Sequence, residues 1–230
     1  MKRSSQDTIV RTRLADEIGR ITKHAPFTVA LTYPSAYGAA MSSLGYQRIY
    51  RAIMDAPGLA CERVVLDDDA EKDLAKQGVP RSYESDRLLA DFPVIAVSVA
   101  YELEIGGLVA MLDRAEIPVS RRVRDGHFVL AGGPLTFSNP LPLSGIADAI
   151  IIGEGESLII DALRVLETIT DKSARLSALA KLPHVFVPEI HGDVLPTVAK
   201  VDDDMVPAYS AITTPHAVLS NMFLVETERG

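Results

Sequence analysis

The sequence predicts a doubly wound α/β domain, with a five-stranded parallel sheet that is covered by helices on both faces. Short β-rich runs alternate with amphipathic helical segments from about residue 27 to residue 170. The run VIAVSVA (94–100) is continuously apolar, which is typical of a parallel strand buried on both faces. Right-handed crossovers then favour the flavodoxin-like strand order 2-1-3-4-5.

Five segments have the composition of strands, and three segments between them have the period of helices. Apolar residues recur three and four positions apart over 46–54, 105–112 and 158–169, so each of these segments should bury one face. Ser42 or Ser43 can cap the first of these helices, and Pro57-Gly58 ends it. We expect the strands at 27–34, 62–66, 94–100, 127–133 and 147–153.

The organisation of the chain follows from where this alternation begins and ends. Residues 1–25 are predicted to be an N-terminal helical arm, and residues 26–170 the α/β domain. Residues 171–230 have connector composition, with a small hairpin expected near 183–201 and then a proline-punctuated extended run.

Composition excludes several classes of function. A formal net charge of −8 argues against nucleic acid as the main partner. No run approaches the roughly 18 apolar residues of a spanning helix, and the N-terminus does not resemble a signal peptide, so we expect a cytoplasmic protein without a membrane partner. Cys61 is the only cysteine, so one chain can form neither an internal disulfide nor a cluster site built from its own cysteines.

Candidate binding residues follow the strands, because ligands of such sheets lie beyond the carboxyl ends of the strands. Glycine there lets a backbone approach a ligand, and a bulky residue at Gly133 would block that approach. No residue is predicted to be catalytic or to bind a metal. The predicted cofactor-binding residues are Ser35, Ala36, Tyr37, Gly38, Ser98, Tyr101, Glu102, Gly132, Gly133, Pro134, Gly153, Glu154, Gly155 and Glu156.

Common catalytic and nucleotide-binding motifs are missing from the sequence. The run GEGES (153–157) lacks the last glycine of a dinucleotide loop, and its two glutamates would repel a pyrophosphate. The five histidines have no metal-spaced partner. Asp67–Asp69 is read as a solvated acidic turn in preference to a divalent-ion site. Either Glu102 or Glu104 could bond a ligand or favour the start of a helix.

Three longer stretches carry a family resemblance. They are PSAYGAAMSSLGYQRIYRAI (34–53), SYESDRLLADFPVIAVSVAYELEIGGLVAMLDRAEIPV (82–119) and AGGPLTFSNPLPLSGIADAIIIGEGE (131–156). In this order they resemble the N-terminal cobalamin-binding-like domain of a radical S-adenosylmethionine (SAM) family. The resemblance spans about residues 27–167 and resumes at 207–230.

The resemblance implies that the catalytic chemistry lies beyond Gly230. In the family, a C-x-x-x-C-x-x-C motif follows the segment similar to FLVETERG (223–230) and binds a [4Fe–4S] cluster and SAM. The chain alone is therefore expected to be inactive, with the radical SAM barrel as its partner in cis or in trans. Residues 222–225 are expected to be a strand that is poorly ordered, or is borrowed by the domain's own sheet or by a second copy, which would give a homodimer.

The resemblance leaves the ligand open between three alternatives. Cobalamin is one, although the segment after the first strand, PSAYGAA (34–40), lacks the D-x-H-x-x-G motif whose histidine ligates cobalt. A corrinoid here would have no histidine as lower ligand. The second alternative is a non-catalytic flavodoxin-like interaction domain with no cofactor, and the third is another small ligand.

Overall fold

The central sheet has six strands in the order β2-β1-β3-β4-β5-β6. In this computed structural model, residues 2–200 and 208–227 are described. Five strands are parallel, and β6 pairs antiparallel with β5. The strands of the sheet are β1 (Phe27–Ala36), β2 (Leu59–Leu66), β3 (Val94–Ser98), β4 (Phe128–Gly132), β5 (Ala149–Ile151) and β6 (Val185–Phe186).

The predicted order of the five parallel strands is confirmed, and the predicted number of strands is wrong by one. The missing strand is β6, which has only two residues, too few for an apolar pattern to be recognised. The predicted strand 27–34 also runs further, to Ala36, because a register shift between Tyr33 and Ala36 accommodates Pro34 within the strand.

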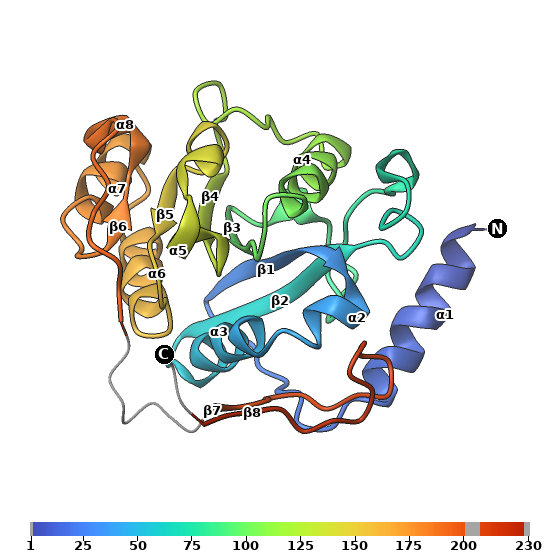
Figure 1. Cartoon of the computed structure of the whole chain (residues 1–230). Helices are drawn as coiled ribbons and strands as arrows, with labels where there is room; N and C mark the ends of the chain where they lie inside the picture. Colours follow the sequence, from blue (N-terminus) through green and yellow to red (C-terminus); the bar gives the residue numbers. More distant parts are fainter. Residues whose placement is uncertain (1, 201–207, 228–230) are drawn as a thin grey trace.

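Helices cover both faces of the sheet, as predicted (Figure 1). On one face α3 and α6 pack against alternate strand residues such as Leu31 and Ile151, and on the other α4 packs against residues such as Ile95. The helices are α1 (Lys2–Ala15), α2 (Tyr37–Ala40), α3 (Leu44–Asp55), α4 (Glu104–Arg114), α5 (Leu135–Ser138), α6 (Leu158–Thr168), α7 (Lys172–Leu179) and α8 (Pro188–His191), with 3-10 turns at Leu74–Lys76, Leu89–Asp91 and Leu141–Gly145.

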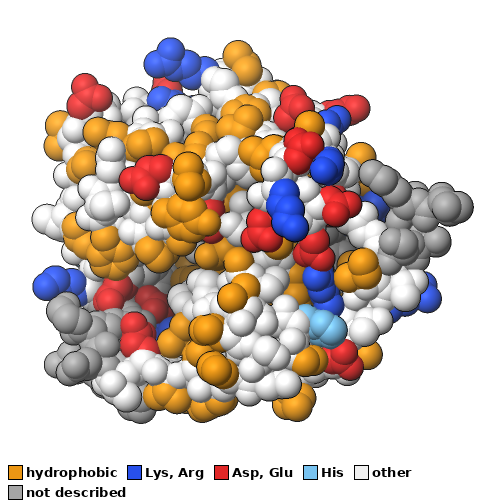
Figure 2. All heavy atoms as spheres, turned by 45° about the vertical axis from the view of Figure 1, so that its right-hand side comes forward, with side chains coloured by type: hydrophobic (Ala, Val, Ile, Leu, Met, Phe, Trp, Pro, Cys, Tyr) orange, Lys and Arg blue, Asp and Glu red, His pale blue; other side chains and the backbone are white. Residues whose placement is uncertain are grey.

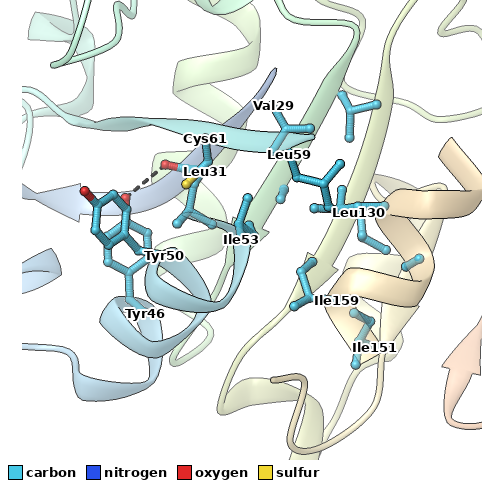
Figure 3. Close-up of a cluster of buried hydrophobic side chains, with 14 of the residues drawn as sticks. Val29, Leu31, Tyr46, Tyr50, Ile53, Leu59, Cys61, Leu130, Ile151 and Ile159 are labelled. Carbon is cyan, nitrogen blue, oxygen red and sulfur yellow. Dashed lines mark hydrogen bonds between the residues drawn. The ribbon is translucent and has the colours of Figure 1, made fainter. Parts of the chain in front are cut away.

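Most residues of the predicted helical stripes are buried, whereas Ile49 and Ile105 are only partly buried. Ser43 caps α3 by accepting a hydrogen bond from the backbone N–H of Tyr46 at 3.4 Å. Tyr46 is fully buried and donates its hydroxyl to the carbonyl of Leu31 at 2.9 Å (Figure 3). Val109 of α4, however, is 36% exposed, so it lies at the margin of the buried stripe.

Cys61 lies in β2 within the core, 1% exposed (Figure 3). Burial raises the pKa of its thiol well above the ordinary value, and the charge of Glu84 adds to this effect. We therefore expect iodoacetamide to leave the native chain unmodified and to alkylate it fully in urea, as read by mass spectrometry. Rapid alkylation of the native chain would contradict this packing.

The N-terminal segment is tied to the sheet by a buried ion-pair network around Arg63 of β2. Its guanidinium contacts both oxygens of Glu17, at 2.6 and 2.9 Å, and one oxygen of Glu84 at 2.6 Å. The side chains of Arg63 and Glu17 are 2% and 0% exposed. These contacts hold the segment after α1, and the segment around Glu84, against β2.

The C-terminal part of the chain differs from the prediction. The expected hairpin at 183–201 is wrong, because β6 pairs with β5 and Ala199 forms a parallel bridge with Gly153. The expected strand at 222–225 is also wrong. Of these residues only Val225 lies in a strand, β8 (Val225–Glu226), which pairs with β7 (Ala208–Tyr209) in a separate two-stranded sheet.

The segment between these two strands docks on α2 and α3 (Figure 1). Gln47 of α3 accepts a hydrogen bond from the backbone N–H of Ile212 at 2.7 Å. The N–H of Val218 bonds the carbonyl of Gly38 at 3.0 Å, and the N–H of Leu219 bonds the hydroxyl of Ser42 at 3.1 Å. We call residues 208–227 the C-terminal arm. No helix among the described residues is long and apolar enough to cross a membrane.

Candidate functional site

A cavity of about 250 Å³ lies between the sheet and helices α3 and α6, and it opens at the carboxyl ends of the strands. Its inner wall is apolar, formed by side chains from the strands and from both helices. Figure 3 labels three of these residues, Leu130 and Ile151 of the sheet and Ile159 of α6. The wall residues are Leu31, Ile49, Ala96, Leu130, Ile151 and Ile159.

The loops after β3, β4 and β5 form the mouth of this cavity. The sheet is parallel here, so these loops meet at one edge. Eight of the predicted binding residues line the cavity: Ser98, Gly132, Gly133, Pro134, Gly153, Glu154, Gly155 and Glu156.

The glycines at the mouth serve different purposes. Gly133 and Gly153 have φ values of +103° and +93°, and a Cβ on either would meet backbone atoms of the chain within 3.0 Å. Their lack of a side chain is therefore required by internal packing. A Cβ on Gly155 would lie 3.5 Å from Ile151 and 3.8 Å from Ile49, in ordinary contact with the cavity wall. At Gly155 a side chain can therefore enter the cavity without backbone strain.

The predicted residues at the junction of β1 and α2 do not line the cavity. The hydroxyl of Ser35 donates to Glu104 at 2.8 Å, and both residues are buried. Ala36 and Tyr37 are buried as well, and the Tyr37 hydroxyl donates to Glu17 at 2.7 Å. Gly38 lies under the C-terminal arm, through the hydrogen bond from Val218 described above. The junction of β1 and α2 is therefore part of the surface on which the arm docks.

Two further predicted residues, Tyr101 and Glu102, are exposed at the carboxyl edge and lie outside the cavity. The buried carboxylate in this segment is Glu104, which also accepts a hydrogen bond from the backbone N–H of Ala100 at 2.5 Å. Burial, with the nearby charge of Glu104, raises the pKa of Tyr33. Glu104, the first residue of α4, thus bonds both the end of β1 and the loop after β3, and these contacts account for its burial.

The sequence did not reveal the charged group that joins α3, the loop after β5 and the arm. Arg48 of α3 approaches Glu156 at 3.3 Å and Glu226 of β8 at 3.7 Å, and its side chain is 11% exposed. Both glutamates line the cavity mouth, and Arg48 lies behind them. Acidic side chains are visible beside the grey residues at the lower left of Figure 2. No sequence signal marks Arg48, because an arginine on a half-buried helix is ordinary.

The cavity lining contains no histidine within the described part of the chain. Among residues 2–200 and 208–227, no three histidine, cysteine, aspartate or glutamate side chains are placed to hold a metal ion. His216 is bonded elsewhere, with Nε2 2.7 Å from Asp16. The lining therefore offers apolar surface, backbone groups and carboxylate oxygens to a ligand.

Comparison with protein families gives one match. The family described as "Radical SAM proteins, N-terminal" matches residues 45–188, more than half of the chain. The chain belongs to this family. The matched region of this radical SAM N-terminal domain includes the loops after β3, β4 and β5 and most of α3. No curated protein and no solved structure matches the chain.

Proposed function

We propose that this radical SAM N-terminal domain is a non-catalytic, ligand-binding module whose cavity takes the flat base of a corrinoid. The observation that carries the proposal is the apolar cavity between the sheet and helices α3 and α6, open at the glycine-rich carboxyl edge. Ligands of open α/β sheets bind at this edge. Radical SAM membership implies SAM and a [4Fe–4S] cluster in the parent protein, and we place them outside residues 1–230.

The size and chemistry of the cavity fit one part of a corrinoid. Sites that enclose a drug-sized ligand measure about 300–1,000 Å³. The cavity, at about 250 Å³, can hold a flat aromatic group, while a larger ring would stay at the mouth. An apolar cavity of about 150 Å³ is already enough for benzene.

The residues present suggest how a corrinoid would be held. Leu130, Ile151 and Ile159 would contact the base through apolar surface, which favours binding by about 25 cal/mol for each Å² buried. Glu154 and Glu156 offer oxygens to the amide N–H groups at the edge of the ring. Within residues 2–200 and 208–227, the lining provides no histidine for cobalt. When bound, a corrinoid supplies methyl-transfer or radical chemistry at cobalt.

An interaction domain without a cofactor is the second candidate. The observation that favours it is a group of exposed apolar side chains at the same carboxyl edge. Tyr101, Leu103 and Phe137 are 49%, 84% and 50% exposed, and exposed apolar patches often mark contacts between proteins. In this candidate function the domain would dock on the radical SAM barrel, in cis or in trans, through this edge.

Titration with hydroxocobalamin distinguishes the two candidates. We expect the purified chain to bind it with a base-off visible spectrum, because the base would enter the cavity. Gly155→Leu should raise the Kd at least about tenfold, since its side chain occupies the space of the base. Gly133 is unsuitable for this test, because any side chain there would strike Val99.

The matched control is Gly145→Leu. Gly145 has no heavy atom within 4 Å of an added Cβ and does not line the cavity, so its substitution should leave the affinity unchanged. An unchanged spectrum at high micromolar cobalamin would instead support the interaction domain. Equal affinity of the wild type and Gly155→Leu would mean that the ligand binds away from the cavity.

A further inference from the structure

The C-terminal arm forms part of the wall of the cavity. Glu226 of β8 lines the mouth, although it is far in sequence from the loops that form the remainder of the mouth. The inner part of the arm, around Ile212 and Thr213, is firmly held. The N–H of Ile212 bonds the buried side chain of Gln47, and two backbone hydrogen bonds join Thr213 to Ile18. The inner part can therefore act as a fixed base for the outer part.

The outer part of the arm is held by fewer contacts. Strands β7 and β8 pair over only two residues each, and the N–H of Ser210 bonds the carbonyl of Leu224 at 3.0 Å. Tyr209 and Phe223 stack on each other at 5.8 Å, yet they are 57% and 61% exposed. A small hairpin with little buried apolar surface opens at low free-energy cost, so the contacts of Glu226 matter for its position.

Arg48 connects this hairpin to the loop after β5. It lies between Glu156, which is 8% exposed, and Glu226, which is 33% exposed. The Nη1 atom of Arg48 is buried and has no hydrogen-bond partner among the described residues, and its contact with Glu226 at 3.7 Å is a charge interaction. Movement of either glutamate therefore changes the interaction that Arg48 makes with the other.

We propose that Arg48 is a positioning residue that latches the β7–β8 hairpin at the cavity mouth, and that filling the cavity releases the hairpin. A group entering the mouth beside Glu156 would shift that carboxylate, weaken the Arg48 bridge and so weaken the interaction between Arg48 and Glu226. The second half of this proposal rests on the proposed function, in that it takes the cavity as a ligand site. The first half, the latch, needs no ligand.

Hydrogen exchange of single backbone amides in the ligand-free chain tests the latch. The amides of Ser210 and Leu224 report on the hairpin, since each bonds the other residue, and the amide of Ile212 reports on the inner part of the arm. Arg48→Met should speed exchange at Ser210 and Leu224 about three- to tenfold and leave Ile212 unchanged. Equal acceleration at all three amides, or none, would overturn the latch.

The matched control is Arg51→Met on the same helix. Among the described residues Arg51 pairs with Asp55 one turn away, at 3.0 Å, so its loss should not change exchange in the hairpin. Arg48→Lys, which keeps the charge but lacks the fork of donors, should restore slower exchange in part. These readouts separate positioning from a loss of global stability, which would accelerate all three amides.

A substitution that fills the cavity tests whether filling it releases the β7–β8 hairpin, and it needs no ligand. Gly155→Leu, which fills the cavity from within, should speed exchange at Ser210 and Leu224 by a similar factor, whereas Gly145→Leu should not. Unchanged exchange in Gly155→Leu would overturn the coupling while leaving the latch intact. A failure to bind hydroxocobalamin would refute the proposed ligand without affecting either exchange result.

Discussion

Replacing Arg63 with methionine is expected to lower the free energy of unfolding by about 3–5 kcal/mol. The substitution removes the positive charge but keeps a side chain of similar length. It removes both contacts of the Arg63 guanidinium from Glu17, whose side chain is 0% exposed, and leaves that carboxylate with Arg20 at 3.1 Å and the Tyr37 hydroxyl at 2.7 Å. Burial alone would lower the pKa of Arg63, but Glu84 and Glu17 outweigh it and raise that pKa, so the buried arginine carries its charge. Urea denaturation followed by circular dichroism measures the loss.

Two companion variants show whether the buried charge is the cause. Adding Glu17→Gln to Arg63→Met should recover part of the lost stability, because an amide costs less to bury than a carboxylate that has lost its pair with Arg63. Arg51→Met removes an exposed pair instead and should cost less than about 1 kcal/mol. A loss below about 1 kcal/mol in Arg63→Met would show that water reaches Glu17 once the arginine is gone.

Gly107→Ala is expected to destabilise the domain by about 3 kcal/mol. Gly107 lies on the face of α4 that contacts β1, and an added Cβ would stand 2.3 Å from the carbonyl oxygen of Pro34. A backbone atom of a central strand cannot move aside, so α4 would have to shift away from the sheet. Thermal unfolding should show a melting temperature lower by roughly 6–12 °C, at about 2–4 °C per kcal/mol for a chain of this size.

Gly106→Ala is the matched control, one residue earlier in the same helix. An added Cβ there would lie 3.2 Å from the end of the Leu74 side chain, which is 40% exposed and can rotate. Alanine also favours a helix over glycine by about 1 kcal/mol, so this variant should be neutral or slightly more stable. A similar loss in both variants would indicate that the helix, and not its approach to Pro34, is sensitive to substitution.

Much of the fold could be predicted from the sequence, because its strands and helices carry long periodic signals. The continuous apolar run of β3 and the stripe of α3 each required burial, and right-handed crossovers determined the order of the parallel strands. β6, β7 and β8 have two residues each, so they carry no period. Their pairing depends on tertiary contacts that no local pattern reports.

The candidate site was predictable in part for the same reason. Loops after β3, β4 and β5 meet at the cavity because parallel strands end at one edge. The loop after β1 satisfies the same rule, yet the C-terminal arm covers it. Arg48 and Glu226 were missed because they reach the mouth from segments about 180 residues apart in the sequence.

The central position of β1 bears on how the domain could be moved between proteins. The family match begins at residue 45, inside α3, whereas β1 (Phe27–Ala36) lies between β2 and β3 and bonds both. In the central sheet, β1 is the strand through which β2 is joined to β3 and the strands beyond it. A chimera whose crossover follows the matched boundary would therefore combine β1 of one parent with the sheet of another. If the first crossover is placed before Phe27, all strands of the central sheet come from one parent. If the second crossover is placed beyond the C-terminal arm, Glu226 in the cavity wall comes from that parent too.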